Sequence, residues 1–129
     1  MIKNALRSKI INDAAVSVII ENKVYPLHLP QGGELPCVLY QSKGTKPLTL
    51  MTNDPGYSQA SFDIAAYAKD YDTCVDLATK VKAALERWKG VEAGVTVLEC
   101  MIDVADTEDY EPDLELYESQ MTITVHYQE

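Results

Sequence analysis

The pattern that decides the fold lies in residues 58–89, SQASFDIAAYAKDYDTCVDLATKVKAALERWK. In its first part apolar and polar residues alternate, which is typical of a strand with one buried face. In its second part apolar residues step by four, three, four and three positions, which predicts an amphipathic helix. The apolar positions are Ala60, Phe62, Ile64 and Ala66 in the strand, and Cys74, Ala78, Val81, Leu85 and Trp88 in the helix. We therefore expect this helix to pack on a sheet.

The ends of this helix carry the residues that begin and end helices. Asp70 or Asp72 can cap its start, and Gly90 can end it, so that it covers about residues 72–89. A second helix is expected near the N-terminus, over about residues 3–15, because Leu6 and Ile10 fall on one helical face.

Further strands are expected on both sides of the central pattern. Residues 37–41, residues 95–104 and a final strand that includes residues 117–127 are rich in β-formers. Prolines and glycines argue against regular structure in residues 24–36, and acidic residues predict a loop over residues 105–113. The predicted fold is α+β, a mainly antiparallel four-stranded sheet with helices 3–15 and 72–89 on one face.

The length of 129 residues fits one domain, with a long loop or hairpin arm at residues 42–57. No apolar run approaches the roughly 20 residues that span a bilayer, so no membrane partner is expected. The first residues lack the pattern of a signal peptide. We expect a protein made in the cytoplasm that leaves the cell only inside a particle.

Charge is divided unequally along the chain. Residues 1–89 hold all 11 Lys and Arg against 9 acids, a net of +2, whereas residues 90–129 hold 11 acids and no Lys or Arg, a net of −11. One interpretation is a solvated acidic face. Another is a subunit with two unlike surfaces, suited to head-to-tail association. Sequence-specific nucleic-acid binding is disfavoured, because it needs a basic surface.

Catalytic and metal-binding motifs are not evident. His28, His126, Cys37, Cys74 and Cys100 lack the close spacing of zinc ligands. The acidic stretch from Asp103 to Glu115 lacks the glycine and ligand order of a calcium loop. No phosphate loop or nucleophile elbow is present. We predict a protein that is not an enzyme and that needs no cofactor or metal.

The eight tyrosines outnumber the single phenylalanine. Tyrosine combines a large contact area with a polar tip and is enriched at interfaces. Some of these tyrosines are therefore candidates for contacts between subunits, and the others for the rim of the core.

Several segments, in order, resemble the phage tail completion proteins of long-tailed phages and prophages. They are Lys23-Val24-Tyr25-Pro26, Leu29-Pro30-Gln31-Gly32, Leu35-Pro36-Cys37-Val38-Leu39-Tyr40, residues 61–68, Asp70-Tyr71-Asp72 and residues 77–85. The similarity covers about residues 3–127. Cys37 departs from it, since an aromatic residue often follows the second proline in that family, and the acidic C-terminal part is stronger than expected.

The resemblance implies a structural virion protein at the head–tail junction. Such a protein forms a ring, typically a hexamer, on the end of the tail tube, stops tube growth and offers a surface to the head connector or head-closure protein. It implies no catalytic residues. The alternatives are another neck component, such as a head-closure or minor capsid protein, and, less favoured, a small enzyme or metal-binding protein.

Two sets of residues are candidates for assembly. Lys43, Lys46, Asn53 and Asp54 lie in the predicted loop, and surface loops on a rigid scaffold often dock partners. Glu99, Asp103, Glu115 and Glu118 are candidates for an acidic ring lumen or interface. An acidic lumen would repel passing DNA.

Overall fold

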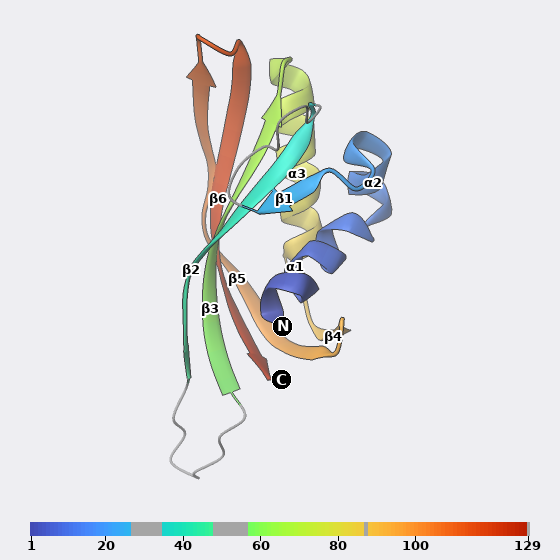
Figure 1. Ribbon diagram of the computed structural model, residues 1–129, viewed down its shortest axis with the longest axis vertical. Coiled ribbons are helices and arrows are strands. Elements are labelled where there is room, and N and C mark those ends of the chain that lie inside the picture. Colours follow the sequence, from blue (N-terminus) through green and yellow to red (C-terminus); the bar gives the residue numbers. More distant parts are fainter. Residues whose placement is uncertain (27–34, 48–56, 87, 129) are drawn as a thin grey trace.

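A computed structural model of the chain describes residues 1–26, 35–47, 57–86 and 88–128. In these residues three helices lie against one face of a six-stranded sheet (Figure 1). The helices are α1 (Ile2–Ile11), α2 (Ala14–Ile20) and α3 (Tyr71–Leu85). The strands are β1 (Val24–Pro26), β2 (Cys37–Pro47), β3 (Tyr57–Ala68), β4 (Gly90–Glu92), β5 (Val95–Glu111) and β6 (Leu116–Gln128).

The prediction of a mainly antiparallel four-stranded sheet is wrong. The sheet has six strands in the order β1-β2-β3-β6-β5-β4 and is curled into a half-barrel. It is mixed, because β1 runs parallel to β2 while all other neighbours are antiparallel. Proline argued against a strand at residues 24–26, but Pro26 ends a strand at the edge of the sheet, where a missing N–H is tolerated.

The predicted acidic loop at residues 105–113 is also wrong. β5 continues to Glu111, and its last residues pair with β6 down to the pair Glu111–Leu116. The acidic side chains of this part are exposed, so their charges stay in water while the backbone completes the ladder. The turn between β5 and β6 is left with residues 112–115.

The predicted helix at residues 3–15 is two helices. Asp13 has an extended backbone, and its side chain accepts hydrogen bonds from the backbone N–H groups of Ala15 and Val16, at 3.0 and 3.2 Å. This is N-cap geometry, so a new helix begins directly after the first one ends.

The predicted helix at residues 72–89 begins at Tyr71 and ends at Leu85, earlier than expected. Asp70 caps its start, since its carboxylate accepts a hydrogen bond from the Thr73 N–H at 3.2 Å. Glu86 is extended and turns the chain out of the helix, but Trp88 still packs into the core. The apolar stripe therefore predicted the buried residues correctly and overextended the helix.

The core lies between the helices and the covered face of the sheet. α3 contacts β3, β6 and β5, while α1 and α2 pack beside α3. Phe62 and Ile64 of β3 face it beside Ile123 and Met121 of β6, and all four are buried. The structure thus fixes the central strands between helices on one side and an uncovered polar surface on the other.

Of the predicted loop or arm at residues 42–57, residues 42–47 belong to β2 and Tyr57 opens β3. The intervening residues 48–56 lie outside the described part. Within the described residues, no helix is long and apolar enough to cross a membrane.

Replacing Phe62 with alanine should lower the free energy of unfolding by about 3–5 kcal/mol, because it leaves a cavity in the core between the helices and the sheet. Urea unfolding measures this loss. The control is Ser61→Ala on the uncovered face of the same strand, with an expected change within about 0.5 kcal/mol. A loss below about 1 kcal/mol for Phe62→Ala would contradict the central position of this side chain.

Candidate assembly surfaces

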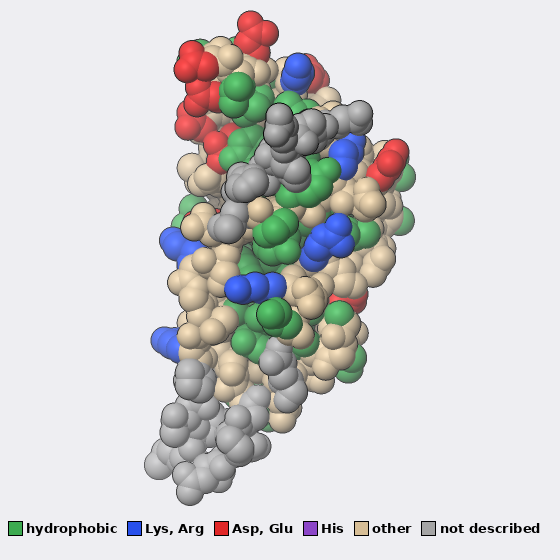
Figure 2. All heavy atoms as spheres, viewed as in Figure 1, with side chains coloured by type: hydrophobic (Ala, Val, Ile, Leu, Met, Phe, Trp, Pro, Cys, Tyr) green, Lys and Arg blue, Asp and Glu red, His purple; other side chains and the backbone are tan. Residues whose placement is uncertain are grey.

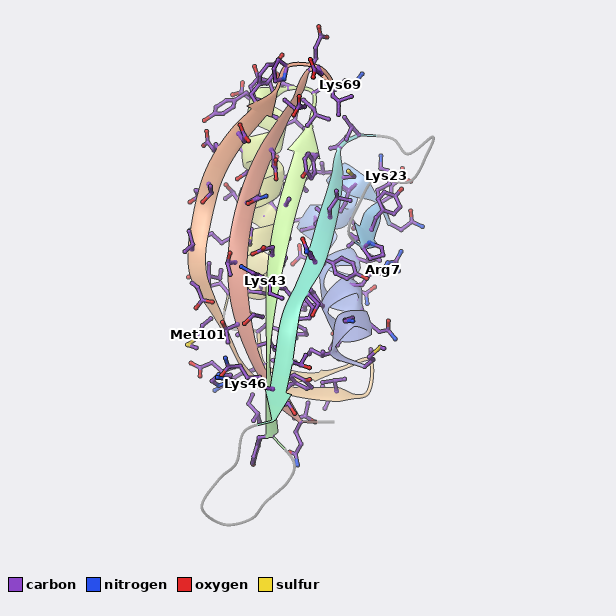
Figure 3. The ribbon with its side chains drawn as sticks, turned by 60° about the vertical axis from the view of Figure 1, so that its left-hand side comes forward. Arg7, Lys23, Lys43, Lys46, Lys69 and Met101 are labelled. Carbon is purple, nitrogen blue, oxygen red and sulfur yellow. The ribbon has the colours of Figure 1, made fainter. Side chains whose placement is uncertain are left out.

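The helices leave one face of β2, β3, β6 and β5 uncovered, and we call it the open face (Figure 3). Alternation along the strands sends every second side chain to it. Most of these side chains are polar, including Gln59, Ser61, Asp63, Gln120, Thr122, Thr124 and His126. Met101 and Val104 of β5 are exposed apolar side chains on the same face. A broad surface of this kind suits contact with a large partner or with passing solvent and solutes.

Three of the four acidic residues that the sequence suggested for a ring lumen or interface lie on this face. Glu99 is opposite His126, and the Asp103 carboxylate accepts a hydrogen bond from the Thr124 hydroxyl at 2.6 Å. Glu118 accepts a hydrogen bond from the Gln120 side chain. They follow the strands rather than form a cluster, since Glu118 is eight residues from His126 along β6, roughly 26 Å.

Glu115, the fourth, belongs to the turn between β5 and β6, where its φ is 51°. Acidic side chains gather at this end of the molecule, whereas most Lys and Arg side chains lie farther along it (Figure 2). The uneven charge of the sequence thus becomes a separation of charge in space.

Lys43 and Lys46, the two basic residues among the docking candidates, both lie on β2. The Lys43 ammonium lies 3.7 Å from the Asp63 carboxylate, which also accepts a hydrogen bond from the Thr122 hydroxyl at 2.8 Å. Lys46 is exposed near the end of β2, beside Gln59 of β3. Asn53 and Asp54 lie outside the described residues.

A cluster of tyrosines lies near the acidic end. The sequence suggested that some tyrosines make contacts between subunits, but it did not indicate which ones. The ring centroids of Tyr110 and Tyr117 are 4.8 Å apart, and those of Tyr71 and Tyr117 are 5.5 Å apart. The Tyr71 hydroxyl donates to the Glu108 carboxylate at 2.8 Å. A shallow hollow of about 250 Å³ lies among these side chains. The excess of tyrosine was the available signal, but only the β5–β6 pairing brings these residues together.

Acidic neighbours and burial both act on the titrating groups. Burial, followed by the charge of Glu118 and a hydrogen bond to it, raises the pKa of the Tyr67 phenol. Burial also raises the pKa of the thiols of Cys37 and Cys74 to about 11, and that of Cys100 to about 12. All three cysteines are free, buried and protonated at neutral pH.

In the described part of the chain, no group of three or more His, Cys, Asp or Glu residues is placed to hold a metal ion.

Comparison with protein families identifies the class to which this fold and surface belong. A family model of a phage tail protein matches residues 4–128, nearly the whole chain. The protein is a structural protein of a phage tail. More specifically, the chain belongs to the family described as Tail completion protein gp17.

Solved structures give a fold relative in a virus-like particle. A chain of the virion of a native gene transfer agent particle is similar with a TM-score of 0.75 and 15% identity, and the match covers 97% of this chain and 92% of that one. Two structures from Akkermansia muciniphila match with TM-scores of 0.33 and 0.35, at 13% and 12% identity. They cover 69% and 70% of this chain and 44% and 41% of their own. A comparison with curated proteins finds no match.

The raised thiol pKa values predict a loss of stability at alkaline pH. Folding favours the protonated thiol, so this stabilisation is complete below the ordinary pKa of 9.0 and is lost as pH rises toward 11–12. Urea unfolding should therefore give a free energy of unfolding that decreases from pH 8 to pH 10. As a control, a thiol reagent at pH 8 should label the three cysteines only after unfolding. Rapid labelling of the native chain would contradict their burial.

Proposed function

We propose that this protein forms a ring, of about six copies, at the head-proximal end of the tail. The ring ends the tail tube and joins it to the head connector or head-closure protein. The family match over residues 4–128 carries this proposal, and the similarity of the fold to a virion protein supports it. The chain would assemble in the host cytoplasm, act without catalysis and remain in the finished virion.

A ring requires an interface that is not self-symmetric and whose rotation closes. The chain fits this requirement, because acidic side chains gather around the β5–β6 turn while Lys43 and Lys46 lie on β2. An acidic part of β5 in one copy, such as that at Glu99, can then meet the basic strand of the next. Opposite charges across such an interface fix its orientation and disfavour the symmetric pairing of like surfaces.

We assign the open face to the channel of this ring. Its side chains are mainly hydroxyl, amide and carboxylate groups, including Asp103 and Glu118, and Glu115 lies at its end. Carboxylates repel DNA phosphates, so this surface would let DNA pass without holding it. The helices would then lie on the side away from the channel.

Removal of the gene tests the position of the protein in assembly. Without the chain, we expect tail tubes of uncontrolled length and heads without tails in electron micrographs, and added purified protein should restore joined particles. Image reconstruction of the restored junction should give six copies with the open face toward the channel. Tails of normal length beside heads that lose their DNA would instead identify another neck component. Joined particles in the absence of the chain would refute the proposal.

A further inference from the structure

The sheet leaves two long strand edges without a partner in the described part of the chain. β4 pairs with β5 only at residues 95–97, although β5 continues to Glu111. β1 pairs with β2 only at residues 38–40, although β2 continues to Pro47. Unpaired N–H and C=O groups on such edges are templates for pairing with another chain.

The two edges lie on opposite sides of the sheet, and parts of them are at the same level along the strand direction. Register through β3 and β6 places Lys46 in one row with Gln59, His126 and Glu99. In the same way Ser42 shares a row with Phe62, Ile123 and Ile102. The segment Glu99–Ile102, which we call the β5 edge, therefore lies at the height of Ser42–Lys46, which we call the β2 edge. β-Bulges flank Glu99–Ile102 on both sides, and β2 has its own register shift between Ser42 and Gly44.

Strand direction also fits. β2 is antiparallel to β3, β3 to β6, and β6 to β5, so β5 and β2 run in opposite directions. Rotation about a ring axis along the strands preserves these directions. The β5 edge of one copy would therefore meet the β2 edge of the next as an antiparallel pair, like the central strands of the sheet.

Charge selects this pairing over the alternatives. The β5 edge carries Glu99, with Asp103 directly after it, and the β2 edge carries Lys43 and Lys46. Two β5 edges would bring carboxylates together, and two β2 edges would bring ammonium groups together. Only the unlike pair places Lys46 of one copy near Glu99 of another, and both side chains are exposed and without an ion pair among the described residues.

We propose that the β5 edge of one copy binds the β2 edge of a second copy and makes a sheet that continues from subunit to subunit. This inference rests on the proposed ring and names the contact that closes it. Exposed Met101 and Val104 lie beside the contact on the open face and add apolar area to it.

Charge reversal tests the contact. Lys46→Glu and Glu99→Lys should each weaken assembly about tenfold or more per interface, because each places like charges across it. Mixing the two variants should restore assembly, since every junction of a ring with alternating subunits is again an unlike pair. The double variant in one chain should also assemble. Lys69→Glu is the control, since Lys69 is exposed and lies at the opposite end of the molecule from Lys46 (Figure 3), and this variant should assemble normally. Assembly is measured as mass in solution and as retention on purified tails.

A covalent test uses Lys46→Cys combined with Glu99→Cys. Within one chain these positions are separated by two strands, about 14 Å, too far for a disulfide. Oxidation should therefore give a ladder of covalently linked copies, and each single-cysteine variant should give none.

The outcomes separate the contact from the function. Unmodified chain that neither assembles nor binds tails would overturn the proposed ring itself. Normal assembly of the charge-reversal variants, no recovery on mixing, or a ring without the disulfide ladder would overturn the edge contact alone. Greater self-association of Lys46→Thr with Glu99→Thr would also overturn it, because it would mean that these charges keep the edges apart.

Discussion

The antiparallel ladder between β3 and β6 is the constraint on which the rest of the structure depends. Its register runs without a shift from the pair Tyr57–Gln128 to the pair Ala68–Tyr117. Because side chains alternate, this unbroken register puts Phe62 and Ile64 of β3 with Met121 and Ile123 of β6 on the same buried face. A slip of one residue would turn this apolar set to water. The same ladder fixes where β2 and β5 attach, and it therefore decides which polar residues share the open face.

Sequence periodicity predicted the centre of the fold better than its edges. The helical stripe from Cys74 to Leu85 and the alternation from Ala60 to Ala66 in β3 follow from burial on one side, and both sets of apolar residues are buried. Residues 105–111 looked like a loop because they are acidic, but their strand is formed by backbone pairing with β6, which composition does not reveal. Likewise β1 depends on β2 as a partner, and the end of α1 depends on the cap that Asp13 gives to α2.

The candidate site was predictable as a set of residue types but not as an arrangement. Charge counting drew attention to Lys46 and Glu99, which are 53 positions apart in the chain. Their common row depends on the bulges in β2 and β5, each of which shifts the register by local backbone geometry. The tyrosine cluster at the acidic end has the same origin, since Tyr110 and Tyr117 meet only across the β5–β6 pair. The sequence therefore indicated an assembly protein, whereas the strand pairing determines which residues share a surface.

A subunit of the proposed ring has to recognise copies of itself and then stop. An open sheet with unlike edges offers such a device, because each copy adds in one orientation and the last contact closes the ring. Light scattering of the purified chain over a range of concentration and salt tests this account most directly. The account predicts a species near six times the 14.3 kDa of one chain, which dissociates as salt screens the charged edges. A species of two copies, or assembly that strengthens with salt, would contradict it.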